Sequence, residues 1–113
     1  MGNVFSSLGA AYENLGIVFH SLAECSKASR YGNLGTVFIS LDEYGKAQAY
    51  FEKALAITRE IGNIRGEAEG YGNLGIVFYS LGEYGKAQAY LEKALTIRIR
   101  LATGKGKEKI TGT

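Results

Sequence analysis

The segment YGNLGTVFISLDEYGKAQAYFEKALAI, residues 31–57, returns 40 residues later as YGNLGIVFYSLGEYGKAQAYLEKALTI, residues 71–97. Over the aligned stretches 31–60 and 71–100, 22 of 30 positions are identical. A fixed period of roughly 20–50 residues is typical of solenoids, whose units bury their apolar faces only against each other. The repeat therefore predicts an extended binding surface rather than a closed catalytic pocket.

A shorter third copy lies upstream. Residues 12–28 match residues 31–47 at 11 of 17 positions, but the offset is 19 residues instead of 40. The stretch that would complete the second helix of this copy is missing. The sequence thus divides into truncated repeat fragments, two whole repeats and a frayed basic tail, which span residues 1–28, 29–65, 66–102 and 103–113.

Each whole repeat has the apolar spacing of two amphipathic helices. In the first repeat, Tyr31, Leu34 and Phe38 follow a helical stripe, and Ala47 and Phe51 belong to a second stripe. The few residues between the stripes allow only a tight turn. We therefore expect antiparallel helices near 28–41, 44–61, 66–81 and 84–101, with one upstream helix over at least 11–21.

Two details of these helices predict local structure. Gly35 and Gly75 lie within the apolar stripe, although a glycine in a helix costs about 1 kcal/mol relative to alanine. We expect their missing Cβ atoms to let the partner helix approach closely. Ser40 and Glu43, like the equivalent pair in the second repeat, have the spacing of a capping box at the start of the second helix.

The order of these residues resembles the tetratricopeptide repeat. An aromatic residue, Leu-Gly, an aromatic residue, alanine and a large apolar residue follow one another here as Tyr31, Leu34, Gly35, Phe38, Ala47 and Phe51. The 40-residue period is similar to the long-repeat branch found in kinesin light chains and Pins-type polarity adaptors, although the family's usual closing proline is absent. The resemblance implies an all-α fold, an α-solenoid of antiparallel helix pairs in a right-handed superhelix, and a role in binding proteins.

One polar position recurs in all three copies, as Asn14, Asn33 and Asn73. At 100° per residue, Asn33 points about 140° away from the centre of the core stripe. The resemblance implies that the first helix of each pair lines a concave groove, and an amide that donates and accepts suits a peptide backbone. Alternatively, the asparagines only tie neighbouring repeats together. The candidate groove residues are Asn14, Asn33, Thr36, Ser40, Glu69, Asn73, Ile76 and Ser80.

Other classes of site have little support in the sequence. The single histidine, His20, and the single cysteine, Cys25, form no triad or metal-ligand spacing. Residues 70–75, GYGNLG, match the dinucleotide-binding fingerprint, but a polar, helix-like stretch precedes them instead of a buried strand. The net charge of +2 does not favour nucleic acid. We expect no enzyme activity, no metal or other cofactor, and no nucleic-acid partner.

The chain has no apolar run of 18 residues and no signal peptide, so we expect a cytoplasmic protein without a membrane partner. Its first residues fit the pattern for N-myristoylation at Gly2, but they also copy a repeat fragment. We interpret the chain as a scaffold that binds a protein or peptide segment. The alternative is a structural unit that self-associates through exposed repeat ends, or a fragment of a longer tetratricopeptide array.

Overall fold

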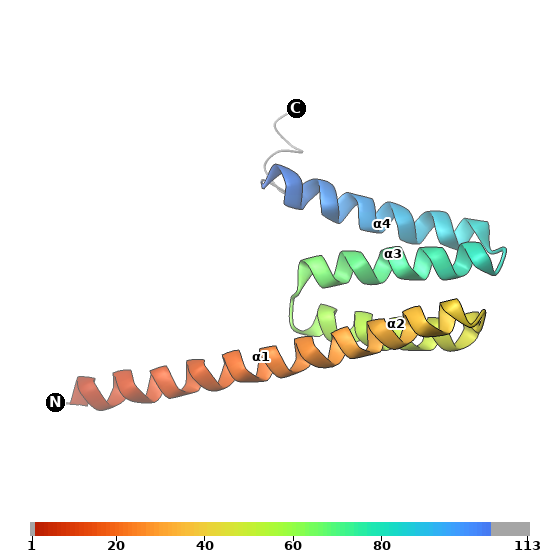
Figure 1. Ribbon diagram of the computed structural model, residues 1–113. Helices are drawn as coiled ribbons and strands as arrows, with labels where there is room; N and C mark the ends of the chain where they lie inside the picture. The colour runs from red at the N-terminus through yellow and green to blue at the C-terminus, as the bar shows by residue number, and fades with distance from the viewer. Residues whose placement is uncertain (1, 105–113) are drawn as a thin grey trace.

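The computed structural model describes residues 2–104, with side chains from residue 6 onward. The described residues form four helices and no strand (Figure 1). Each helix packs against the next one along the chain, and neighbouring helices are antiparallel. The expected all-α solenoid is therefore confirmed. The helices are α1 (Gly2–Ser40), α2 (Tyr44–Glu60), α3 (Ile64–Ser80) and α4 (Tyr84–Thr103).

The last three helices agree with the expected ranges to within about two residues. Helix α4 extends to Thr103, where we had expected the tail to begin, and Gly104 follows it in a left-handed conformation. Residues 105–113, the rest of the expected tail, lie outside the described residues. Gly2, the candidate myristoylation site, begins α1.

Each turn between helices contains one residue with positive φ. These residues are Asp42 at 60°, Gly62 at 73° and Gly82 at 81°. Glycine reaches this left-handed region without strain, and aspartate tolerates it better than most residues. The reversal of chain direction therefore depends on one permissive residue per turn.

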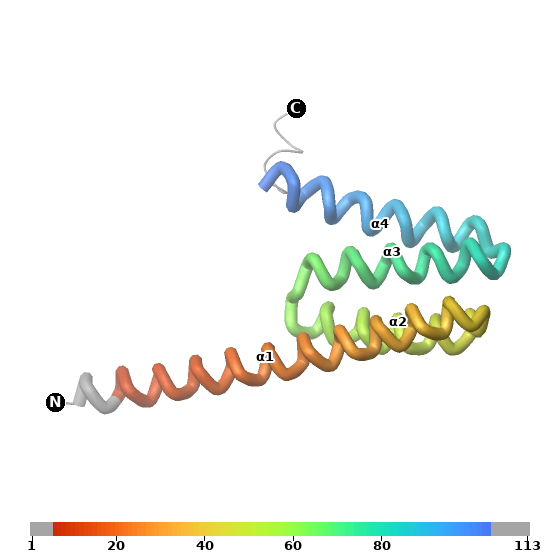
Figure 2. The backbone as a smooth tube through the Cα atoms, in the orientation of Figure 1, coloured from red at the N-terminus to blue at the C-terminus, as the bar shows by residue number. Residues whose placement is uncertain are grey.

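Helix α1 is one continuous helix of 39 residues, so the expectation of two separate helices was wrong (Figure 2). Ala23 occupies the position held by Asp42 and Gly82 in the whole repeats. A left-handed alanine is strained, and no glycine or proline lies between Gly16 and Gly32. The truncated copy therefore runs straight into the first helix of the next repeat.

The capping boxes that we expected do not form. Glu43 and Glu83 are the N-cap residues of α2 and α4, and neither side chain caps the helix. Because α1 continues through Ser40, the Ser40 hydroxyl donates to the Thr36 carbonyl of its own helix at 3.3 Å. The Glu43 carboxylate instead forms an ion pair with Lys46 at 2.9 Å.

The deepest part of the core lies where α2 and α3 meet. Phe51 of α2 and Leu74 and Val77 of α3 are the largest fully buried side chains. A Cβ atom on Gly35 would lie 2.6 Å from Phe51 Cε1, and one on Gly75 would lie 2.6 Å from Leu91 Cγ. The expected role of these two glycines is confirmed, because each lets the second helix of its repeat approach closely.

An aromatic cluster between the two helices of each pair is the same in both repeats. Phe38 stacks on Tyr50 with ring centroids 5.5 Å apart, and Lys53 lies 5.2 Å above the Tyr50 ring. Such pairs contribute about 0.5–1.5 kcal/mol each. In the second repeat, burial raises the pKa of Tyr71, and the hydrogen bond from its hydroxyl to Glu67 at 3.1 Å raises this pKa further.

Two glycines of α1, three residues apart, should respond oppositely to alanine. Gly35→Ala should lower the free energy of unfolding by roughly 1–3 kcal/mol, because the buried Phe51 ring cannot move away. Gly32→Ala should raise it by roughly 0.5–1 kcal/mol, because a Cβ there meets nothing within 4 Å. Urea unfolding at one fixed protein concentration measures both. Changes of the same sign would contradict this account of the helix contact.

Candidate binding groove

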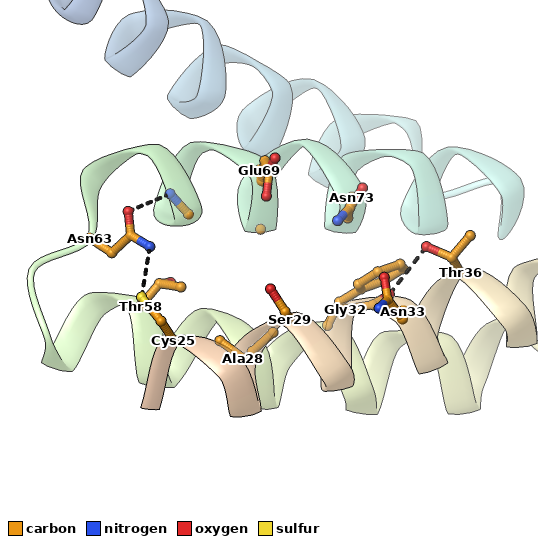
Figure 3. A pocket seen from close by; sticks show the side chains of 14 residues that line it. Cys25, Ala28, Ser29, Gly32, Asn33, Thr36, Thr58, Asn63, Glu69 and Asn73 are labelled. Atoms are coloured by element: carbon orange, nitrogen blue, oxygen red, sulfur yellow. Dashed lines mark hydrogen bonds between the residues drawn. The ribbon is translucent and has the colours of Figure 1, made fainter. Parts of the chain in front are cut away.

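A hollow of about 360 Å³, the central groove, lies between α1 and α3 with α2 behind it (Figure 3). It runs between the first helices of the two whole repeats. The central groove is lined by Cys25, Ala28, Ser29, Gly32, Asn33, Thr36, Phe51, Ala54, Thr58, Asn63, Gly66, Glu69, Gly70 and Asn73.

Two of the recurring asparagines lie in the central groove. Asn33 projects from α1 and Asn73 from α3, on opposite sides of the hollow (Figure 3). Neither amide is hydrogen-bonded to another of the described residues. Each therefore keeps a free donor and a free acceptor for another molecule.

Three other expected residues also line hollows of this surface. Thr36 and Glu69 line the central groove, and the Thr36 hydroxyl donates to the Gly32 carbonyl at 3.1 Å. A second hollow of about 340 Å³ lies between α3 and α4, and Ile76 lines it. Glu69 and Asn73 line both hollows, so the two are adjacent along α3.

The remaining three expected residues line neither hollow. Asn14 is exposed on the N-terminal half of α1, which projects beyond the other helices (Figure 1). Ser40 and Ser80 are the last residues of α1 and α3 and are exposed there. Shared position in the repeat therefore does not by itself place a residue in a hollow, because Asn14 has the position of Asn33 and Asn73 but lies on the part of α1 that projects beyond the other helices.

The floor of the central groove comes from residues of α2 that the polar stripe of the first helices does not predict. Phe51, Ala54 and Thr58 lie behind the hollow, and the buried Thr58 hydroxyl donates to the Leu55 carbonyl at 2.9 Å. The expected groove residues all belong to the first helix of a pair. The helical spacing of Phe51, Ala54 and Thr58 in the sequence was the feature from which this floor could have been predicted.

Asn63 joins the three helices around the central groove. Its Oδ1 accepts a hydrogen bond from the Gly66 backbone N–H at 3.0 Å, which caps the start of α3. Its Nδ2 donates to Cys25 Sγ of α1 at 3.7 Å. Both bonds are drawn in Figure 3. This asparagine therefore holds the turn between α2 and α3 against α1.

The central groove is almost neutral. Glu69 is the one charged residue among those that line it. Within the described residues, no three His, Cys, Asp or Glu side chains gather into a possible metal site. None of the described helices, including the long α1, is apolar enough over a sufficient length to cross a membrane.

The family model of the tetratricopeptide repeat matches residues 30–100, which include both whole repeats. The chain belongs to the tetratricopeptide repeat family. This family consists of non-enzymatic repeat scaffolds that generally mediate protein–protein interactions. Comparisons with curated proteins and with solved structures give no significant match.

Asn63 offers a test of how this tetratricopeptide pair is held together. Asn63→Ala should lower the free energy of unfolding by about 1 kcal/mol, because α3 loses its side-chain cap. Asn63→Asp keeps the cap acceptor but cannot donate to Cys25, so its loss should be clearly smaller. Urea unfolding of both variants measures the difference. An equal loss in both would mean that the bond to Cys25, not the cap, stabilises the turn.

Proposed function

We propose that this chain is a protein-interaction scaffold that binds an extended peptide or protein segment in the central groove. The observation that carries the proposal is the pair of free amides, Asn33 and Asn73, on opposite walls of one hollow. They come from equivalent positions of successive repeats. The chain thus offers the same polar contact twice along one surface.

An extended peptide needs such contacts because its backbone N–H and C=O groups have no partners of their own. One asparagine amide can donate to a carbonyl and accept from an N–H. Each bond contributes about 0.5–1.5 kcal/mol. Hydrogen bonds to the backbone do not distinguish one ligand sequence from another. We therefore expect the fit of the ligand's shape and side-chain size to the groove to determine which peptides bind.

The alternative role for these asparagines is to tie neighbouring repeats together. Within the described residues, no hydrogen bond from Asn33 or Asn73 crosses between the repeats. Packing of Phe51, Leu74 and Val77 already joins them. Both points favour the role in ligand binding.

The composition of the lining favours a weakly charged ligand. Glu69, which lines both hollows, is their one carboxylate, and Arg98 of the second hollow is their one cation. A lysine or arginine of the ligand would therefore find a partner on the side of the central groove, whose lining holds no cation. The proposal involves no catalysis. It also includes a cytoplasmic location and, from the 40-residue period, membership of the long-repeat branch that resembles kinesin light chains and Pins-type adaptors.

The proposal predicts how a groove double variant behaves. Peptides selected from a random-sequence library against this chain serve as the probe. Replacing Asn33 and Asn73 with alanine should weaken their binding roughly five- to 150-fold, because two hydrogen bonds are lost. Helix content should stay the same. Calorimetric titration and circular dichroism on one preparation give both values.

The matched control replaces Ser40 and Ser80, which occupy equivalent positions of the same two helices but line neither hollow. The Ser40→Ala, Ser80→Ala variant should bind the selected peptides as tightly as the unmodified chain. Unchanged affinity together with a lowered melting temperature in the asparagine variant would contradict the proposal. That result would assign the asparagines to the stability of the repeat pair.

A further inference from the structure

The described part of the chain leaves apolar side chains uncovered at Leu34 and Val37 of α1 and on two further surfaces. One, the α4 outer face, is formed by Tyr79, Tyr84, Leu91 and Leu95 around an apolar hollow of about 370 Å³. The other is the α1 arm, residues 6–22, in which Leu8, Tyr12, Leu15, Ile17, Val18, Phe19 and Leu22 are all exposed. The arm projects away from the helix pairs (Figure 1).

The contact of α2 with α3 shows what covers such a face. In α2, Phe51 is 1% exposed and Leu55 is 7% exposed, and Leu55 packs against α3 at Gly70. The equivalent residues of α4, Leu91 and Leu95, are 44% and 57% exposed. The α4 outer face is therefore the surface that α2 presents to α3, without a helix seated on it.

The α1 arm carries the sequence of the helix that would be seated there. Residues 14–19, NLGIVF, are identical to residues 73–78 of α3. In α3, Leu74 and Val77 are 0% exposed, whereas the equivalent Leu15 and Val18 of the arm are 48% and 51% exposed. The arm therefore has the apolar residues of α3 and lacks the helices that bury them.

One position distinguishes the arm from the rest of α1. A Cβ atom on Gly70 would lie 3.0 Å from Leu55 Cδ1, so α3 lies close to α2 there. The arm has Ala11 at the position of Gly70, whereas the second half of α1 has Arg30. A methyl group needs only a small shift of a leucine tip, but an arginine side chain blocks the approach. The arm is thus the better match for the α4 outer face.

The same chain cannot cover the arm with α2. The two first-helix segments of α1 are 19 residues apart, and this offset turns their apolar faces by about 100° around the helix. The arm's apolar face therefore does not continue the face that packs on α2. The described helices of the same chain therefore leave the apolar residues of the arm exposed.

We propose that the α1 arm of one copy docks on the α4 outer face of a second copy, as α3 lies on α2. This proposal goes beyond peptide binding and does not depend on it. In this arrangement Leu15 and Val18 cover Leu91 and Leu95. Two different surfaces of the chain meet, so the contact is heterologous, and it either closes reciprocally or continues from copy to copy.

One position departs from the α2–α3 contact. Arg98 of α4 replaces the buried Thr58 of α2, which packs closely at Gly66. The arm has Ser7 at the position of Gly66. Arg98 is exposed at the edge of the face, and its guanidinium can donate to the Ser7 hydroxyl there.

The test uses one charged variant for each surface. Leu95→Asp blocks the α4 outer face and leaves the arm intact, and Val18→Asp does the reverse. Both side chains are exposed in the single chain, so circular dichroism should show unchanged helix content. Each variant alone should self-associate at least ~10-fold more weakly than the unmodified chain in sedimentation velocity, because docking would bury an unpaired charge. An equimolar mixture should form a one-to-one complex, since each variant supplies one intact surface.

Matched controls place the same charge beside each surface. Ile99 of α4 is equivalent to Arg59, which stays exposed beside α3, and Ile17 of the arm is equivalent to Ile76, which stays exposed in α3. Ile99→Asp and Ile17→Asp should therefore associate like the unmodified chain. An unmodified chain that is monomeric over the whole concentration series would overturn the proposal. A monomeric mixture, or a blocked variant that alone self-associates as tightly as the unmodified chain, would do the same.

Discussion

A first helix of a repeat is fully buried when a second helix packs on both of its sides, and among the described helices α3 alone has both. Its own second helix, α4, packs on one side at Gly75, and α2 packs on the other at Gly66 and Gly70. Consequently Leu74 and Val77 are completely buried. The first helix of the first repeat has a second helix on one side only, so its equivalent residues stay exposed. The position of the core around α3 and the uncovered apolar surfaces on α1 and α4 both follow from this packing.

The length of α1 depends on a much more local feature. A turn between helices in this chain needs one residue that tolerates positive φ, and the whole repeats supply Asp42, Gly62 and Gly82. The truncated copy supplies Ala23, and the helix does not stop. The truncated copy thus has neither the residues of a second helix nor a turn residue that would end the first one. The result is a straight arm rather than a third helix pair.

Much of the fold could be predicted from periodicity, because burying a repeated stripe requires a repeated helix pair. The close approach at Gly35 could be predicted for the same reason, since a glycine inside an apolar stripe is costly unless another helix lies against it. Periodicity could not locate the end of a helix, because apolar residues follow a helical spacing both before and after Ala23. Ser40 and Glu43 suggested a cap, but Ser40 is still part of α1, and Glu43 is the N-cap residue of α2.

The groove was less predictable than the fold. A stripe of polar residues identifies one face of one helix, and Asn33, Thr36, Glu69 and Asn73 of the predicted stripes line the central groove. A hollow, however, is a property of three helices. Its floor of α2 residues and its corner at Asn63 depend on how those helices meet, and a pattern within one helix does not contain that information.

The groove and the proposed contact between copies use different sides of a first helix. Ile76 of α3 stays exposed although helices are seated on both sides of α3, so docking need not cover the first-helix side of the groove surface. It does cover Leu91 and Leu95, which also line the second hollow. In the proposed arrangement, the α1 arm takes the place of a further first helix beyond α4. Asn14 occupies the position in the arm that Asn73 occupies in α3. The docked arm would therefore add Asn14 to the row formed by Asn33 and Asn73 and lengthen the groove by one repeat, which gives a physical reason for the same residue at a position that lines no groove in a single chain.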